Sequence, residues 1–266
     1  MDQGRCAGRQ GQELKEHGAG AKAPVFFMSA EIIPIAGTDI RFVPGEWPLP
    51  DAMRAEVAET WARLKAGKPH IWDGRILGFS PPIIGADGIL RSEAREDAYS
   101  VFLTWRAAGF PDVGMFHVFG SALILSSDGA VILGVMGGDT VNAGRVYAPG
   151  GSLEPRDVRA DGTVDVDFCI RTELVEETGL DPGAAEQGAL LAIFEGQTLS
   201  LARVFRFAET ADELLKVIRA NLDMQEEREL ADVVACRTSG EGHAAGDLAA
   251  YAAALLDAVS SGQVAL

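Results

Sequence analysis

The sequence predicts an α/β (α+β) protein in which strands and helices are interleaved through the second half of the chain. Residues 117–125 and 130–136 are apolar runs joined by Ser-Ser-Asp-Gly, which is typical of a β-hairpin. Residues 173–180, ELVEETGL, indicate a helix that ends at a glycine. Residues 212–222 are amphipathic and residues 244–259 are rich in Ala and Leu, so both segments are expected to be helical.

The remaining segments of this half complete the expected sheet. Residues 145–148 read as a short strand that leads into Pro149-Gly150-Gly151, where a turn would let the backbone come close to a ligand. Residues 154–166 are polar and contain Pro and Gly, which predicts a loop in which Asp165 or Asp167 caps the following helix. Further strands are expected at residues 189–194 and 198–207 and after an acidic loop that begins at residue 226.

The first half of the chain divides into a tail and an extension. Residues 1–28 are rich in Gly, Gln and Lys and are expected to be disordered, residues 29–112 to form an α+β extension, and residues 113–266 to form the main domain. In the extension we expect strands at 31–35 and 40–43 with a turn at 37–39, a helix at 51–66 capped by Asp51, a hairpin turn at Asp73-Gly74 and a helix at 93–107.

Three carboxylates share one face of the helix that ends at Gly179. Glu173, Glu176 and Glu177 stand at positions i, i+3 and i+4, a spacing at which like charges repel and destabilise a helix by a few tenths of a kcal/mol per pair. A bound cation relieves this repulsion, and Mg²⁺ prefers carboxylate oxygens together with waters and phosphates. The alternative is an acidic helix face that is simply solvated.

The same stretch resembles the Nudix box, G-x5-E-x7-R-E-U-x-E-E-x-G-U, where U is a bulky aliphatic residue. The matching positions are Glu173, Leu174, Glu176, Glu177, Gly179 and Leu180, with Gly151 as the first glycine. The chain departs from the pattern twice, because the loop after Gly151 is longer and because Thr172 stands where the family has Arg, with Arg171 one residue early. In the family that Arg orients a glutamate of the box.

The resemblance implies an α/β/α sandwich with a mixed sheet and a hydrolase that acts on phosphoric anhydride bonds with Mg²⁺ or Mn²⁺. It implies that Glu173, Glu176 and Glu177 are catalytic and hold the metal, and that the general base lies in a loop after the box. The candidates for that base are Glu226, Glu227 and Glu229. The candidates for substrate binding are Gly150, Gly151, Arg145, Tyr147 and Arg75.

A second resemblance concerns the extension. A helix that contains Trp61, the segment Lys68-Pro-x-x-Trp-Asp-Gly-Arg75 and an expected helix around Tyr99 are similar to the N-terminal region of some Nudix nucleotide-sugar hydrolases. This implies a pyrophosphatase that cleaves a nucleotide sugar of the UDP-glucose or ADP-ribose type into a nucleoside monophosphate and a sugar phosphate.

Composition limits the partners. The net charge of −16 disfavours duplex nucleic acid and anionic membranes, whose binding needs Lys and Arg, and leaves a small phosphorylated nucleotide as the expected partner. Cys6, Cys169 and Cys236 form no C-x-x-C pair, so we expect neither a disulfide framework nor a zinc site. A cytoplasmic location is expected. The oligomeric state stays open, a homodimer included.

Two other classes of function stay open. A Nudix-fold module that binds or senses a nucleotide sugar without turnover is favoured by Thr172 in place of Arg, and disfavoured by the three retained glutamates. An acidic structural or partner-binding protein would leave Pro149-Gly150-Gly151 unexplained.

Overall fold

The computed structural model describes residues 30–226 and 228–263 of the chain. The expected disordered tail at residues 1–28, together with Cys6 and Glu227, lies outside the described residues. Among the described helices, none is both long and apolar enough to cross a lipid bilayer.

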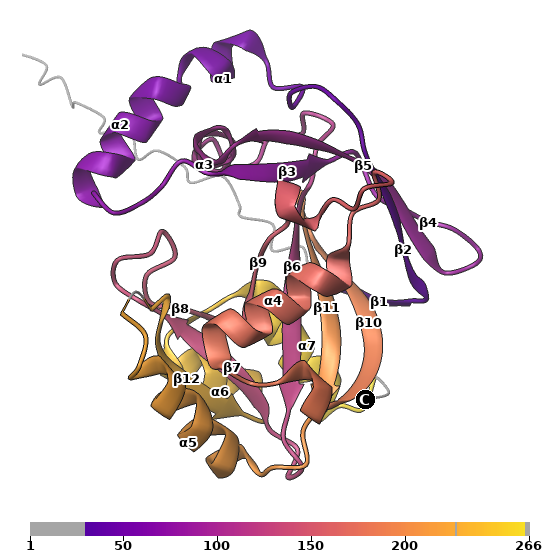
Figure 1. Cartoon of the computed structure of the whole chain (residues 1–266), viewed down its shortest axis with the longest axis vertical. Helices are drawn as coiled ribbons and strands as arrows, with labels where there is room; N and C mark the ends of the chain where they lie inside the picture. Colours follow the sequence, from indigo (N-terminus) through magenta and orange to yellow (C-terminus); the bar gives the residue numbers. More distant parts are fainter. Residues whose placement is uncertain (1–29, 227, 264–266) are drawn as a thin grey trace, which may run out of the picture.

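The larger of two sheets forms the body of the molecule (Figure 1). It is mixed, because β6 pairs in parallel with β11 and antiparallel with β7 and β9. Its path is β1 (Glu31–Ile35), β10 (Glu186–Glu195), β11 (Thr198–Arg206), β6 (His117–Leu125), β7 (Val131–Met136), β8 (Arg145–Tyr147) and β13 (Asp247–Leu248), with β12 (Leu230–Cys236) on β7 and β9 (Gly150–Ser152) on β6. The hairpin predicted at residues 117–136 is confirmed as β6 and β7.

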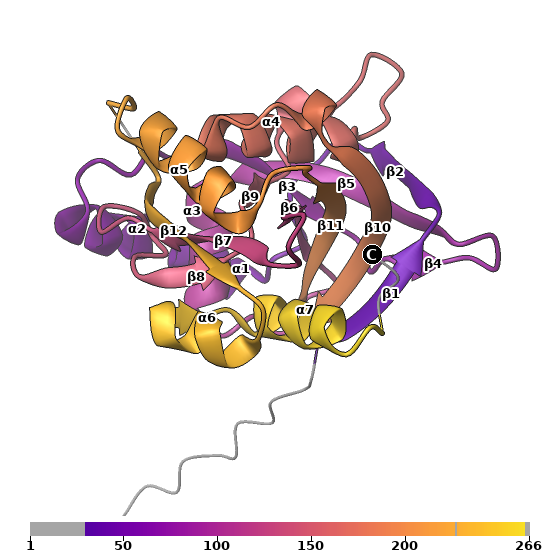
Figure 2. The same ribbon diagram turned by 90° about the horizontal axis from the view of Figure 1, so that it is seen from below.

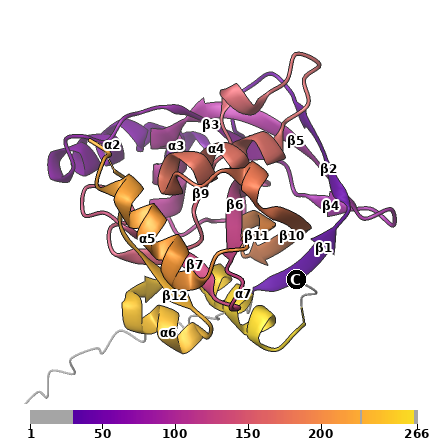
Figure 3. The same cartoon turned by 60° about the horizontal axis from the view of Figure 1, so that its bottom comes forward.

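Helices cover both faces of this sheet, as Figure 2 shows. α4 (Val166–Thr178) and α5 (Ala211–Leu222) lie on one face, and α6 (Ser239–Ala245) and α7 (Ala250–Ser260) lie on the other. Figure 3 shows α5 beside β12, against which it packs. The expected α/β/α sandwich is therefore what the chain forms.

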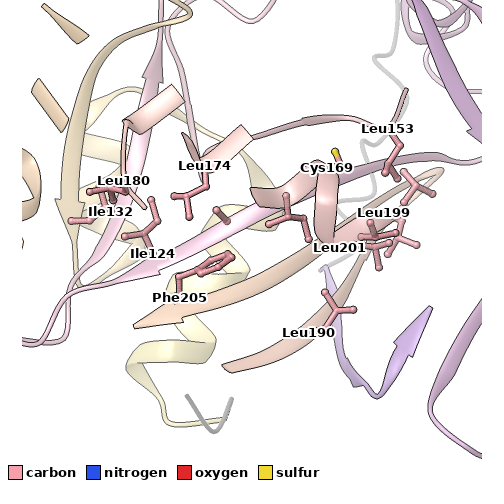
Figure 4. Close-up of a cluster of buried hydrophobic side chains, with 14 of the residues drawn as sticks. Ile124, Ile132, Leu153, Cys169, Leu174, Leu180, Leu190, Leu199, Leu201 and Phe205 are labelled. Carbon is pink, nitrogen blue, oxygen red and sulfur yellow. The ribbon is translucent and has the colours of Figure 1, made fainter. Parts of the chain in front are cut away.

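Side chains of β6 alternate between the two cores because successive residues of a strand point to opposite faces. Ile124 belongs to the core under α4 and α5, and Leu125 to the core under α6 and α7. Figure 4 shows Cys169 and Leu174 of α4 above Ile124, in the first of these cores. The buried Cys169 is part of that packing.

A smaller sheet with three helices lies at one end of the molecule (Figure 1). The long strand β5 (Ile89–Ala98) pairs with β2 (Gly37–Phe42), β3 (Arg75–Phe79) and β4 (Ile83–Ile84). The helices are α1 (Asp51–Ala55), α2 (Val57–Gly67) and α3 (Tyr99–Ala107). Trp47 and Trp105 meet edge to face at 6.0 Å in the core that they share with α3.

The two sheets are joined through the first two strands. β1 pairs with β10 of the larger sheet and β2 with β5 of the smaller one, with only Ala36 between them. The turn predicted at residues 37–39 is therefore wrong, because these residues are the start of β2. A backbone hydrogen bond of 2.8 Å from Leu77 to Leu153 connects the sheets again. The boundary proposed at residues 112 and 113 stays a prediction.

Three predictions for the segment between residues 51 and 74 are wrong. The helix expected at 51–66 breaks at Glu56, and its N-cap residue is Pro50, so Asp51 does not cap it. The element before Asp73-Gly74 is the helix α2 and not a strand, so these residues are not a hairpin turn. Asp73 instead accepts a hydrogen bond of 2.7 Å from the backbone N–H of Ser100 at the start of α3.

The helix expected at 93–107 is half strand. Residues 93–98 belong to β5, although Ala, Glu and Arg favour helices, because pairing with strands on both sides outweighs a propensity of a few tenths of a kcal/mol per residue. The closing helix expected at 244–259 is interrupted at Gly246, where a Cβ would stand 2.9 Å from the backbone oxygen of Gly144. The chain approaches β8 there and forms β13 before α7 begins.

Candidate active site

The helix that carries the three glutamates is α4, and local signals set both its ends. Asp165 caps it by accepting a hydrogen bond of 3.0 Å from the backbone N–H of Phe168, as one of the two predicted caps. Asp167 pairs with Arg203 at 2.8 Å instead. Gly179 ends the helix with a φ of 72°, in the left-handed region that glycine adopts without strain.

Packing of α4 on β6 points its acidic face at β9. Leu174 is fully buried against the larger sheet, and Glu173 and Glu177 flank it on the side of β9. The side chain of Glu173 is 12% exposed and Glu177 is 5% exposed, whereas the side chain of Glu176 is 56% exposed. The three glutamates thus share a face, as their spacing predicted, but Glu177 is buried, Glu173 is largely buried and Glu176 is exposed.

Gly150 and Gly151 lie in strand β9, so the turn predicted there is wrong. Both are nevertheless sites of close approach. A Cβ on Gly150 would stand 2.1 Å from the carbonyl oxygen of Gly120, and one on Gly151 would stand 2.6 Å from the carboxyl group of Glu173. The backbone N–H of Gly150 donates a hydrogen bond of 2.8 Å to Oε2 of Glu177. The two glycines therefore make the space in which the buried carboxyl groups lie.

Burial raises the pKa of both inner glutamates. The pKa of Glu173 rises to about 7, first because of burial and then because of the charge of Glu176, while Arg156 opposes the shift. The pKa of Glu177 is raised well above its usual value, again by burial first and then by Glu173 and Glu229. Within the part of the chain that the structure describes, Oε1 of Glu177 is buried without a hydrogen-bond partner. A negative charge here is costly until a cation or a proton compensates it.

An arginine that was absent from the sequence-based candidates contacts this cluster. Arg156 lies in the short 3₁₀ turn η1 (Pro155–Asp157), inside the expected loop between β9 and α4. Its guanidinium pairs with Glu173 at 3.1 Å, with Glu154 at 3.2 Å and with Glu176 at 3.5 Å. The only sequence signal for it is an arginine within an insertion next to the box, and spacing alone does not show where such a loop folds.

An acidic cavity of about 380 Å³ lies over this face of α4. It is lined by Glu173, Glu176, Glu177, Gln225, Glu226 and Glu229. Two of the three general-base candidates, Glu226 and Glu229, are therefore brought to the cavity, and Glu227 lies outside the described residues. Partial burial, followed by the charge of Glu176, raises the pKa of Glu229.

The donor set of the acidic cavity fits a hard divalent cation. Carboxylate oxygens are the ligands that Mg²⁺ and Mn²⁺ accept, and the unpartnered Oε1 of Glu177 is a buried oxygen in need of one. Within residues 30–226 and 228–263, no three Asp, Glu, His or Cys side chains already stand in a metal-binding arrangement. Arg156 supplies the positive charge between Glu173 and Glu176 in this conformation.

A second cavity, of about 300 Å³, lies on the other side of β9. Aromatic and basic residues line it, among them Tyr99, Phe102, Arg106, His117, Arg145 and Tyr147, together with Gly150, Gly151 and Ser152. α3 of the extension supplies the first three. Two of the predicted substrate-binding residues, Arg145 and Tyr147, thus lie in the same cavity as the two glycines.

The rings at the base of this aromatic–basic cavity are ordered by stacking. His117 lies 4.2 Å from Phe102 and 5.5 Å from Phe119, measured between ring centroids. Burial lowers the pKa of His117 to about 3, so its ring is neutral at physiological pH and its Nε2 is 3.0 Å from Oγ of Ser152. The place of this histidine in a cavity wall could not be read from the sequence.

Arg75 does not reach either cavity. It is on β3, where its Nε donates a hydrogen bond of 2.6 Å to Glu96 on β5. Arg106 is better placed than Arg75 to bind a ligand, although the sequence offers no motif for it. It is part of the wall of the aromatic–basic cavity, and burial lowers its pKa.

No protein family model matches the sequence, and no curated protein matches it. Several solved Nudix structures superpose on part of the chain. A Nudix hydrolase from M. smegmatis, RenU, is 15% identical with a TM-score of 0.37, over 57% of this chain and 91% of that chain. The Nudix domain of Shewanella oneidensis NrtR, complexed with ADP ribose, is 12% identical with a TM-score of 0.36, over 61% of this chain and 98% of that chain.

In a third similar structure, the matching part is less than half of the other chain. It is a bifunctional NMN adenylyltransferase/ADP-ribose pyrophosphatase from Francisella tularensis, complexed with AMP and a Mn ion. It is 15% identical with a TM-score of 0.37, over 60% of this chain and 45% of that chain. These partial superpositions are of Nudix proteins, the family that the motif resembles, and this chain's activity has to be inferred from its own residues.

Proposed function

We propose that this protein is a metal-dependent pyrophosphohydrolase of a nucleoside diphosphate linked to another moiety, with a nucleotide sugar as the substrate class. The observation that carries the proposal is the pairing of two cavities across β9. One presents a cluster of carboxyl groups that includes Oε1 of Glu177, which is buried and has no hydrogen-bond partner among the described residues, and the other presents aromatic rings and arginines. A diphosphate with a metal ion would meet both requirements at once.

Glu173, Glu176 and Glu177 would hold Mg²⁺ or Mn²⁺. Such an ion, when bound, offsets the charge of a diphosphate and lowers the pKa of a coordinated water. The chain's part is to fix the carboxyl groups. Gly150 does so through its hydrogen bond to Glu177, and Gly151 through the space it leaves for Glu173.

The aromatic–basic cavity would hold the nucleotide. Aromatic rings stack on a base, and arginine forms paired hydrogen bonds with phosphate oxygens. Arg106 has no ion-pair partner among the described residues, and Arg145 has only a long contact of 3.7 Å with the exposed Asp247. Two arginines and one carboxylate, Glu195, line this cavity, and neither arginine forms a close ion pair among the described residues, which favours a negatively charged ligand.

A proton acceptor would complete the site. Glu226 and Glu229 line the acidic cavity and remain the candidates, with Glu227 beside them in sequence. The products would be a nucleoside monophosphate and a sugar phosphate. A cytoplasmic location and a homodimer are proposals that rest on the sequence alone.

The direct test is turnover of a panel of nucleotide sugars, with UDP-glucose and ADP-ribose included, in the presence of Mg²⁺ or Mn²⁺. We expect phosphomonoester products from at least one of them and loss of turnover in Glu177→Gln. The exposed Glu186→Gln is the matched control, since it makes the same chemical change far from both cavities.

The same panel separates the enzyme from a binding module, which Thr172 in place of Arg keeps as the second candidate. Calorimetric binding of a nucleotide sugar by the wild type, with no product after prolonged incubation with either metal, would favour the module and contradict hydrolysis.

A further inference from the structure

We propose that Arg156, which the inserted segment between β9 and α4 carries, is the positioning residue that holds the carboxyl group of Glu173 in the acidic cavity. The inference rests on the hydrolysis proposed above for its functional meaning. On this proposal the inserted segment has a function. It supplies a guanidinium to the acidic cavity, whereas α4 carries Thr172 at the position where the Nudix box has Arg.

The contacts of Arg156 are those of a clamp rather than of a single surface pair. Nη2 donates to Oε1 of Glu173 at 3.1 Å, Nη1 lies 3.5 Å from Oε1 of Glu176, and Nε lies 3.2 Å from Oε2 of Glu154. A planar guanidinium can use several N–H groups at once, so one side chain restricts two carboxyl groups of α4 relative to each other.

The contact with Glu173 matters most among these. Glu173 is 12% exposed, whereas Glu176 is 56% exposed, and pairs that water screens contribute little. Glu173 also faces Gly151, which leaves just enough room for its carboxyl group. A carboxyl group held between a backbone on one side and a guanidinium on the other has few alternative orientations.

The segment that presents Arg156 is itself fixed. Asp157, which is 2% exposed, accepts a hydrogen bond of 2.7 Å from the backbone N–H of Glu154 across the turn. The backbone N–H of Asp165 donates to the carbonyl oxygen of Asp157 at 2.7 Å, and Val158 forms a bridge with Val164. Arg156 is thus delivered from a closed, hydrogen-bonded turn and not from an unconstrained loop.

The arginine next to the box glutamates in sequence does not take this place. Arg171 forms no ion pair among the described residues, and it lies on α4 one position before Thr172. The chain therefore departs from the Nudix box in two linked ways: it lacks the arginine of the box at Thr172, and its longer segment carries Arg156.

The test compares Arg156→Ala with Arg171→Ala, which removes the same charge from the neighbouring helix. For Arg156→Ala we expect kcat on the best nucleotide substrate to fall about 30-fold or more while KM changes less than about 3-fold, because the residue acts on Glu173 and not on the nucleotide. Arg156→Lys is expected to recover part of kcat, since an ammonium keeps the positive charge but lacks the planar fork of N–H groups that fixes the carboxyl groups in one orientation. Arg171→Ala should match the wild type.

A second readout needs no turnover. Mn²⁺ binding to the nucleotide-free protein, followed by electron paramagnetic resonance, is expected to be weakened about 5-fold or more by Arg156→Ala, because the Glu173 carboxyl group loses its orientation. Unchanged or tighter Mn²⁺ binding would overturn the proposal, since it would mean that the guanidinium only competes with the cation. A loss of kcat with unchanged Mn²⁺ binding would overturn it too.

The two proposals fail separately. If the wild type turns over no substrate but Arg156→Ala still weakens Mn²⁺ binding, hydrolysis is contradicted and the positioning role stands. If Arg156→Ala does not fold, as judged by thermal unfolding, Arg156→Lys and Arg156→Gln carry the same comparison, and equal Mn²⁺ affinity of both with the wild type would refute the role.

Discussion

The two sides of β9 differ in charge, in origin and in the kind of ligand that each needs. The acidic cavity is built by α4 and the segment around Glu229, both from the second half of the chain. The aromatic–basic cavity takes part of its wall from β8 and part from α3 of the extension. β9 supplies Gly150, Gly151 and Ser152 to the lining of the aromatic–basic cavity, and its Gly150 donates a hydrogen bond to Glu177 of the acidic cavity.

This difference teaches how a protein with a net charge of −16 could attract a polyanion. The overall field repels phosphate, so binding has to rely on local arrangements. In the aromatic–basic cavity, arginines provide positive charge directly. In the acidic cavity, a metal ion bound by the carboxyl groups would provide it. The first three of the following predictions each disturb one cavity or the strand between them, and the fourth concerns stability.

The largest effect is expected from Glu177→Gln, which breaks the acidic side. It replaces the buried carboxyl group that accepts the hydrogen bond of Gly150 with a neutral amide. Because the amide brings no negative charge to a bound metal ion, we expect kcat to fall about 1,000-fold with little change in KM. Steady-state kinetics with saturating Mn²⁺ checks this. A fall of less than about 10-fold would remove Glu177 from the proposed machinery.

Gly151→Ala changes β9, the strand that lies between the two cavities. The new Cβ would stand 2.6 Å from the carboxyl carbon of Glu173 and force that side chain to move, so we expect kcat to fall on the order of 100-fold. Gly138→Ala is the matched control, because a Cβ there meets nothing within 4 Å. Equal activities of the two variants would show that the position of Glu173 does not limit the reaction.

Arg106→Ala tests the aromatic–basic side. If this residue binds a phosphate, KM should rise about 10-fold while kcat stays within about 3-fold, since binding is lost in both the ground state and the transition state. Arg75→Ala, whose guanidinium pairs with Glu96, should leave KM unchanged. A larger effect from Arg75 than from Arg106 would reverse the assignment made from the structure.

The smallest effect is expected on stability. The pKa of Asp157 is raised by burial to about 6 and that of Glu173 to about 7, so the folded state binds these protons more tightly than the unfolded state does. The contribution of these two groups to the stability of the metal-free protein is therefore greatest at low pH and is lost as pH rises from about 5 to about 8, by on the order of a few kcal/mol.

Thermal unfolding at both pH values, with and without Mn²⁺, measures this loss. Asp157→Asn should reduce the difference between the two pH values, because its amide does not ionise. Stability that increases over the same pH range in the metal-free wild type would contradict the assigned shifts.

The parts of the molecule that depend on local spacing could be predicted from the sequence. The hairpin of β6 and β7, the glycine end of α4 and the shared face of Glu173 and Glu177 all follow from residues close in the chain. What failed depended on partners far away. β5 was expected to begin a helix because its pairing with β2 and β3 is not visible in its own residues.

The candidate site shows the same limit. Spacing predicted the three glutamates, but Arg156 and Arg106 reach their cavities through the folding of an insertion and through the docking of α3. Gly150 and Gly151 were expected at a turn, and their real requirement is the approach of Gly120 and Glu173 to a strand. The sequence shows which residue types are present, but it does not show which residues they contact in the folded chain.

The crossing of the chain at Ala36 affects any attempt to produce the second half alone. A fragment that starts at residue 113 would lack β1 and leave one side of β10 without its partner strand. Such an open edge offers unpaired backbone groups to other copies, and shortened versions of this protein should therefore self-associate. Fragments intended for crystallisation or labelling should keep the chain from residue 30 onward, so that the outermost strand closes the sheet.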